Sequence, residues 1–162
     1  MQQSRGIPTA LLVLAAGVVA VVLVAHALHR GSSGPVFYAA RPAFTPGVLN
    51  PDVTPATIRR TICSRGWTKT VRPPTSYTSA LKLVQMREYG FSGGPADYQE
   101  DHFISLELGG APTDRKNLWP ERRPRADHVD TIENDLNAQV CSGELSLAEA
   151  QRREAEMKWT DG

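Results

Sequence analysis

A pair of adjacent glycines, Gly109 and Gly110, follows a short apolar run that begins at Phe103. The next four residues, Ala-Pro-Thr-Asp, favour turns, so the segment predicts a connection between two short antiparallel strands. The second strand of a hairpin returns alongside the first, and we therefore expect Asn117 to lie beside His102. This constraint determines which side chains can meet in the middle of the domain.

Two neighbouring residues ahead of the glycines have the chemistry of a metal-dependent phosphodiesterase. His102 can act as a general base, because an unperturbed imidazole titrates near neutral pH. The carboxylate of Asp101 is a hard oxygen ligand suited to Mg²⁺ or Mn²⁺. Consecutive strand residues point to opposite faces, so a bulge or a strand end must redirect one of the two side chains.

The stretch from Asp101 to Gly110, followed by Asn117-Leu118, resembles the HNH nuclease motif, whose ββα-metal fold binds one catalytic cation between a hairpin and a helix. The resemblance implies that His102 is the general base, Asp101 a metal ligand, and Asn117 the residue that positions the base or its loop. It implies one divalent cation as cofactor, Mg²⁺ or Mn²⁺. More widely, the chain is similar to a small group of bacterial envelope or secreted proteins with an HNH-like domain, over residues 61–74, 98–120 and 130–143.

The second metal ligand is expected on a helix that follows the hairpin and ends near Cys141. We choose Asp130, which matches the resembled pattern, with His128 as the substitute. The chain has Ser105 where this family often has proline, and it lacks paired Cys-x-x-Cys knuckles, so no structural zinc is implied. Helical spacing predicts a buried face of Val129, Ile132, Leu136 and Val140, and a polar face of Asp127, Asp130 and Asn134. As an alternative to metal binding, Asp127, Asp130 and Glu133 form a solvated acidic face near the positive N-terminus of the helix.

An apolar run without Asp, Glu, Lys or Arg covers residues 7–28. About 20 such residues span a bilayer, and Ala25-His26-Ala27 also fits a cleavage site. We therefore expect a signal peptide or N-terminal membrane anchor over residues 1–30, a flexible tether rich in Gly, Ser and Pro over 31–51, and one HNH-like domain over 52–162. Either form of the N-terminal segment exports the domain.

The chain has two cysteines, Cys63 and Cys141, and the expected export would place both in an oxidising compartment. In an oxidising compartment such a pair more often forms a disulfide than two buried thiols, and we expect this bridge. The expected fold class is α+β, a mostly helical small domain around a ββα-metal hairpin–helix core, preceded by the N-terminal transmembrane or signal helix.

Further helices are expected around the hairpin. Thr54-Pro55 opens a short helix through Cys63, and residues 71–74 are extended. A helix over residues 76–88 ends at Gly90, with Leu81, Val84 and Leu83 facing inward. A final helix begins at Ser146, which has capping-box spacing with Glu149, and runs to about Trp159.

The charge balance does not indicate a nucleic-acid-binding protein, because 18 Lys and Arg face 17 Asp and Glu; without Arg5 and Arg30 the ratio is 16 to 17. Local basic groups are nevertheless suited to phosphate contacts. The group nearest the hairpin is Arg115, Lys116, Arg122, Arg123 and Arg125. A second group, for which a merely solvated surface is an equal alternative, is Arg59, Arg60, Arg65, Lys69 and Arg72.

Together these features predict a metal-dependent endonuclease that hydrolyses DNA, or alternatively RNA, outside the cytoplasm. In this hypothesis Asp101 and Asp130 hold the cation against the phosphate, and His102 removes a proton from water. A non-catalytic envelope protein that uses an HNH-like scaffold for binding or structure is the alternative. A third possibility is a hydrolase of another phosphoester of the cell surface.

Overall fold

A computed structural model of the chain describes residues 39–160. They form a small mixed domain in which helices surround one two-stranded sheet. In chain order, the elements are η1 (Ile58–Arg60), α2 (Trp67–Val71), α3 (Thr75–Tyr89), η2 (Pro95–Asp97), β1 (Tyr98–His102), η3 (Leu106–Leu108), η4 (Arg115–Asn117), β2 (Leu118–Arg122), α4 (Arg125–Ser142) and α5 (Leu147–Thr160).

The predicted antiparallel pair is present. β1 pairs with β2 from Tyr98 opposite Arg122 to His102 opposite Leu118. The strand ends earlier than the apolar run suggested, because the chain turns after Phe103 into the short helix η3. This strand end is the redirection that the Asp101-His102 pair requires, and both side chains line one cavity.

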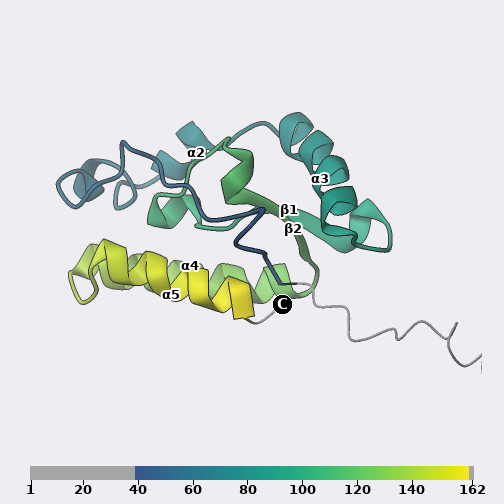
Figure 1. Cartoon of the computed structure of the whole chain (residues 1–162). Coiled ribbons are helices and arrows are strands. Elements are labelled where there is room, and N and C mark those ends of the chain that lie inside the picture. Colours follow the sequence, from purple (N-terminus) through teal and green to yellow (C-terminus); the bar gives the residue numbers. More distant parts are fainter. Residues whose placement is uncertain (1–38, 161–162) are drawn as a thin grey trace, which may run out of the picture. The chain divides into compact units, whose positions relative to one another are not determined.

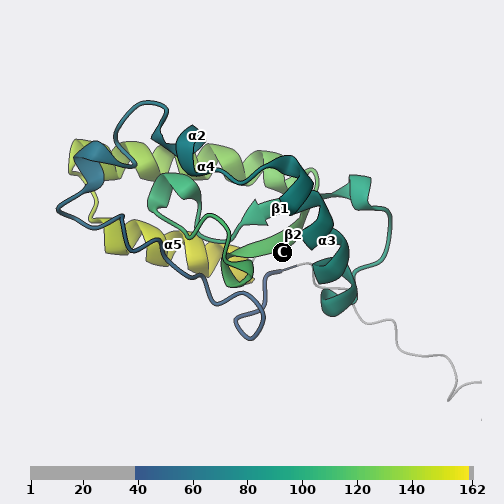
Figure 2. The ribbon, with the colours of Figure 1, turned by 90° about the horizontal axis from the view of Figure 1, so that it is seen from above.

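Helices cover the hairpin from different directions (Figure 1). α3 packs against both strands, whereas α4 packs against β2 and η3. α4 and α5 lie side by side as a helical hairpin joined by a short turn, and Figure 2 shows the pair from above. The sheet residues and α4 therefore meet at one edge of the hairpin, where the candidate site lies.

The ends of the long helices follow the sequence signals. α3 ends at Gly90 and α4 at Gly143, both with left-handed backbone (φ 69° and 87°) that glycine adopts without strain. At the start of α5, the Glu149 N–H donates to Ser146 Oγ at 3.2 Å. The predicted N-cap of this helix is thus confirmed.

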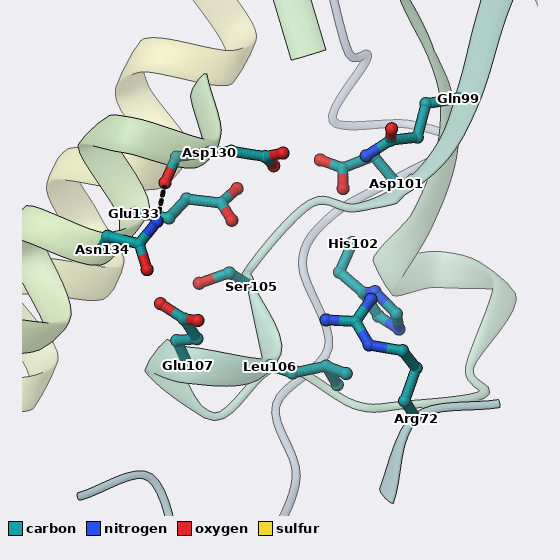
Figure 3. Close-up of a pocket in the computed structure, with 10 residues that line it drawn as sticks. All are labelled: Arg72, Gln99, Asp101, His102, Ser105, Leu106, Glu107, Asp130, Glu133 and Asn134. Atoms are coloured by element: carbon teal, nitrogen blue, oxygen red, sulfur yellow. Dashed lines mark hydrogen bonds between the residues drawn. The ribbon is translucent and has the colours of Figure 1, made fainter. Parts of the chain in front are cut away.

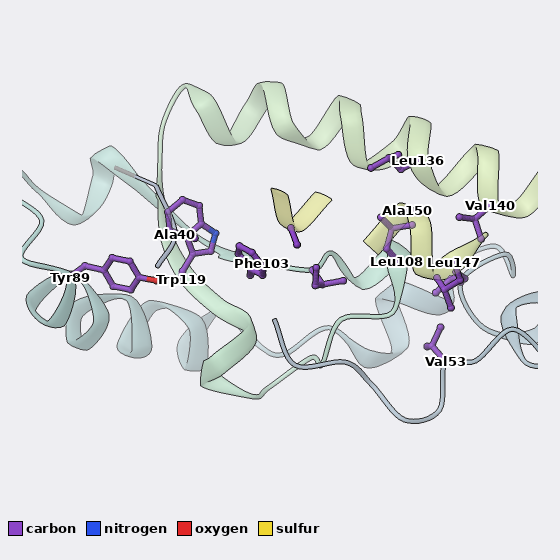
Figure 4. Packing of buried hydrophobic residues seen from close by; sticks show 13 residues of the cluster. Ala40, Val53, Tyr89, Phe103, Leu108, Trp119, Leu136, Val140, Leu147 and Ala150 are labelled. Carbon is purple, nitrogen blue, oxygen red and sulfur yellow. The ribbon is translucent and has the colours of Figure 1, made fainter. Parts of the chain in front are cut away.

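The core lies between the hairpin, η3 and the α4–α5 pair (Figure 4). Phe103, Leu108 and Trp119 have no exposed surface, and Leu136 and Val140 of α4 are buried against the same cluster. The predicted buried face of α4 is present, although Ile132 is only partly buried. Packing of α4 on this core fixes the position of its polar residues beside β1.

The inner face of α3 differs from the prediction. Leu83 and Val84 are exposed by 46% and 39%, and the buried positions are Gln85, Met86 and Tyr89. Gln85 Nε2 donates to the carbonyls of Arg115 and Leu118, at 3.0 and 2.7 Å. A buried carbonyl requires a hydrogen-bond donor. A glutamine therefore occupies the inner face of α3, where the apolar pattern predicted leucine and valine.

The short helix expected from Thr54 to Cys63 is reduced to the three residues of η1. Thr57 Oγ1 donates to the carbonyl of Asp52 and accepts from the Thr54 N–H, and such local bonds compete with helix formation. Val71, predicted to be extended, belongs to α2, and the extended stretch begins at Arg72.

The second half of the expected tether packs on the domain. Ala40 is buried and its N–H donates to the Lys158 carbonyl at 3.1 Å, and Leu49 forms a β-bridge with Gly110. Backbone pairing orders this segment in spite of its turn-forming composition. The expected signal or anchor segment, residues 1–30, lies outside the described residues. Within residues 39–160, no helix is sufficiently long and apolar to span a bilayer.

A disulfide joins Cys63 and Cys141, with 5.6 Å between the Cα atoms, and confirms the predicted pairing. It connects the turn after η1 to the last turn of α4. Such a bridge is typical of proteins that fold in an oxidising compartment.

Candidate functional site

Three carboxylates meet at the edge of the hairpin. Asp101 at the end of β1 and Asp130 and Glu133 of α4 present oxygen atoms that all lie within 4.8 Å of one another. The structure thus brings together the two predicted ligands, Asp101 and Asp130. It adds Glu133, which we expected on a solvated face but which is only 8% exposed. Its spacing of three residues from Asp130 is the signal that could have identified it.

These carboxylates border a cavity of about 220 Å³ (Figure 3). The α4 carboxylates lie on one side, and His102 and Arg72 on the other. Two oxygen ligands of one Mg²⁺ are at most about 4.2 Å apart, and those of Ca²⁺ about 5 Å. The limit of 4.8 Å on the separation of the three carboxylates lies within the span for Ca²⁺ and slightly exceeds that for Mg²⁺, and Asp130 is exposed. The other lining residues are Gln99, Ser105, Leu106, Glu107 and Asn134.

His102 is held through one ring nitrogen. Its Nε2 lies 2.9 Å from the Pro112 carbonyl oxygen, which can only accept a hydrogen bond. The neutral imidazole therefore carries its proton on Nε2, and its Nδ1 has a free lone pair. Burial lowers the pKa of His102 below its usual value, and the charge of Arg72 lowers it further. The hydrogen bond to the Pro112 carbonyl and the charge of Asp101 act in the opposite direction but are outweighed. The imidazole is thereby kept neutral and able to accept a proton near pH 7.

Lys158 of α5, which sequence patterning placed in no site, is completely buried beneath the carboxylates. Its Nζ donates to Asp101 Oδ2 at 3.0 Å and to Glu133 Oε1 at 2.6 Å. Burial alone would raise the pKa of Asp101, but Lys158 and hydrogen bonds outweigh it and lower that pKa to about 2. Asp101 is consequently ionised at any physiological pH.

A second buried pair lies next to Asp101. Glu121 of β2 is fully buried and receives a hydrogen bond from Arg125, which also donates to the Met157 carbonyl. Burial and the neighbouring Asp101 raise the pKa of Glu121 to about 8. Arg125, predicted to contact nucleic acid, thus lies among internal partners, with only 18% of its side chain exposed.

Asn117 contacts the loop rather than the imidazole. It is fully buried, and its side chain binds Ile104 and the Ala111 carbonyl. These bonds hold the chain that follows His102 against the chain that precedes β2. Of the two roles expected for Asn117, its contacts match the second, positioning of the loop.

The remaining predicted basic residues are dispersed. Arg115 pairs with Glu88 at 2.5 Å and lines, with Lys116, a different cavity. Arg123 donates to Gln99 at 3.1 Å, at the rim of the site. Arg122 pairs with Tyr98 across the hairpin, at its far end from His102. From the second basic group, Arg72 lines the site, and the substitute ligand His128 is exposed and outside the carboxylate cluster.

In comparisons with known proteins, no family model, no curated protein and no solved structure matches this chain.

Proposed function

We propose that this protein is a metal-dependent phosphodiesterase that cleaves nucleic acid outside the cytoplasm, with DNA as the main substrate. The observation that supports it best is the meeting of Asp101, Asp130 and Glu133 in a cavity that also contains His102. An HNH-like ββα-metal core is the corresponding proposal for the fold. The order of β1, β2 and α4 in the chain matches that arrangement.

His102 would act as the general base. Its Nε2 is committed to the Pro112 carbonyl, so Nδ1 is the atom that takes a proton from an attacking water. The lowered pKa keeps this nitrogen unprotonated. Because the bond to Pro112 also fixes the orientation of the ring, the base needs no second side chain to orient it.

Arg72 would bind the phosphate. It follows α2 at the rim of the cavity, across from Asp130 and Glu133 of α4 (Figure 3). No ion-pair partner for it lies within the described part of the chain. A guanidinium binds two phosphate oxygens at once. Its position beside His102 would place the scissile phosphate between the base and the carboxylates.

The carboxylates of Asp101, Asp130 and Glu133 would hold one divalent cation, Mg²⁺ or Mn²⁺, on the cavity side. When bound, such an ion supplies Lewis-acid stabilisation of charge on the phosphate oxygens. Asp101 is suited to this task because Lys158 keeps it ionised and leaves its second oxygen free of that contact.

Digestion of supercoiled plasmid by the full-length, disulfide-bonded protein tests the proposal, in buffers with Mg²⁺, Mn²⁺ or EDTA. We expect metal-dependent nicking that His102→Ala abolishes. The matched control is His128→Ala, which removes an exposed histidine on α4 and should retain activity. Parallel reactions with RNA and with a small phosphodiester identify the substrate class. Nicking that persists in His102→Ala would eliminate this residue as the base.

One observation favours a second function, a non-catalytic envelope module. The ammonium of Lys158 already contacts two of the three carboxylates, so part of their negative charge is neutralised from within. In this alternative the cluster stabilises the fold and the cavity binds a partner. Folded protein without hydrolytic activity under any metal would support this function.

A further inference from the structure

The ammonium of Lys158 has the surroundings of a bound metal cation. Besides Asp101 and Glu133, the backbone carbonyl of His102 accepts from Nζ at 2.7 Å. Glu154 Oε1 lies 3.4 Å away. All four neighbours are oxygen atoms, and three of them are carboxylate oxygens. Hard divalent cations select such an all-oxygen shell.

Each carboxylate around Lys158 also has a connection elsewhere. Asp101 and Glu133 belong to the group whose oxygens gather with Asp130 at the cavity. Glu154 lies deeper, is completely buried and accepts from the Ser105 N–H at 2.8 Å, while its Oε2 is buried without a hydrogen-bond partner among the described residues. Four carboxylates are thus arranged around two positions, one at the cavity and one at Nζ.

Such an arrangement resembles the charge pattern of a two-cation site. Hydrolases with two metal ions place them about 3.5–4 Å apart and bridge them with shared carboxylates. Here Asp101 and Glu133 would be the shared ligands, Asp130 would serve the cavity position, and Glu154 the inner position. The inner position holds an ammonium instead of a metal ion.

We propose that Lys158 is a built-in counter-cation that fills the inner half of a two-cation carboxylate site and thereby limits the site to one divalent ion at the cavity. The cavity ion rests on the proposed function, whereas the inner position does not. Lys158 is a positioning residue, because it acts on Asp101 and Glu133 and does not line the cavity. The proposal differs from an ordinary buried ion pair in one respect. When the ammonium of Lys158 is removed, a divalent ion should be able to take its place, whereas in an ordinary ion pair it could not.

The test compares the full-length wild-type protein with Lys158→Ala and Lys158→Gln. The melting temperature is measured in EDTA and in Mn²⁺, and bound Mn²⁺ is counted from the loss of the free-ion signal in electron paramagnetic resonance. The matched control is Lys82→Ala. Lys82 donates to the carbonyls of Pro95 and Tyr98, at 2.7 and 2.9 Å, and forms no ion pair within residues 39–160.

We expect both Lys158 variants to melt well below wild type in EDTA and Mn²⁺ to recover at least half of the difference. Each variant should bind one Mn²⁺ more than wild type. Lys82→Ala should lose stability that Mn²⁺ does not restore. If wild type binds no Mn²⁺ but the variants bind one, the counter-cation inference stands and the proposed metal-dependent function fails. Variants that gain neither Mn²⁺ nor stability, or that remain unfolded in Mn²⁺, would overturn the inference.

Discussion

The side chain of Asn117 binds both backbone groups of Ile104: Oδ1 accepts from the N–H and Nδ2 donates to the carbonyl, each at 2.9 Å. Nδ2 also donates to the Ala111 carbonyl at 3.0 Å. One amide thus replaces the strand pairing that ends at His102. This residue thus holds the loop that follows the candidate base His102.

Asn117→Ala should therefore destabilise the domain by about 3 kcal/mol, because it leaves three buried backbone groups without their partner. Urea unfolding followed by circular dichroism measures the change. Asn134→Ala, which alters an exposed asparagine of α4, is the control and should change stability by no more than about 0.5 kcal/mol. Equal effects of the two substitutions would contradict this role of Asn117.

Gly110 is required by close packing. A Cβ at this position would lie 1.7 Å from the Ile104 carbonyl oxygen, which is backbone and is already held by Asn117. We expect Gly110→Ala to cost more than about 3 kcal/mol or to prevent folding. At Gly94 a Cβ would have only an ordinary contact of 3.8 Å, with Asp97. Gly94→Ala should therefore cost less than about 1 kcal/mol in the same denaturation experiment.

The disulfide closes a loop with a sequence separation of 78 residues. On the chain-entropy model, a loop of this length contributes about 4.5 kcal/mol by restricting the unfolded chain. The double variant Cys63→Ser/Cys141→Ser should lose a comparable amount, measured by urea unfolding. Wild type with a reducing agent should behave like the double variant, and the double variant itself should not respond. A response of the double variant to the reducing agent would indicate another cause.

Glu100 provides a pH dependence of stability. Both of its carboxylate oxygens are buried and have no hydrogen-bond partner among the described residues. Burial, followed by repulsion from Asp101, raises its pKa from 4.5 to about 8. The folded state therefore binds more protons than the unfolded state between these values, and the free energy of unfolding should fall as the pH rises from about 5 to 8.

Glu100→Gln should be more stable than wild type at pH 8 and should reduce this pH dependence, because the amide cannot ionise. Urea unfolding at pH 5, 7 and 9 measures both effects. Glu144→Gln removes an exposed carboxylate and should leave the profile of wild type unchanged. A Glu100→Gln profile as steep as that of wild type would assign the dependence to other groups, such as Glu121.

Substitutions of Arg72 and Arg115 distinguish between two possible binding positions for nucleic acid. Arg72 lines the candidate site, whereas Arg115 is paired with Glu88 at another cavity. On the proposed function, Arg72→Ala should raise KM and lower kcat/KM at least tenfold. The reason is that the variant loses one charge-assisted phosphate contact, which contributes about 1.5–3 kcal/mol. Arg115→Ala should retain nearly full activity. The reverse result would place the substrate over α3 instead of α2.

Sequence patterns predicted the local parts of the fold best. Turn residues identified the hairpin, glycines and Ser146 identified the helix ends, and the cysteine pair identified the disulfide. These features depend on a few neighbouring residues or on a single possible pairing. The helix expected after Thr54 was largely wrong, because side-chain bonds of Thr57 compete locally with the helix.

The interior of the candidate site was less accessible to prediction. Asp101 and Asp130 could be paired from spacing and resemblance, but Glu133 and Lys158 have the composition of an ordinary solvated helix surface. Their burial depends on how α5 packs against α4, and sequence periodicity does not specify this contact. The same reason explains Arg125, whose neighbour Met157 is 32 residues further along the chain.

The position of Lys158 near the end of the last described helix also sets an order of assembly. During translation, β1 and α4 are synthesised before Lys158, the residue that neutralises their carboxylates. Until α5 docks, Asp101 and Glu133 face each other without that ammonium, and their mutual repulsion opposes closure of the core. The core should therefore close around these carboxylates only after α5 has been synthesised and has docked.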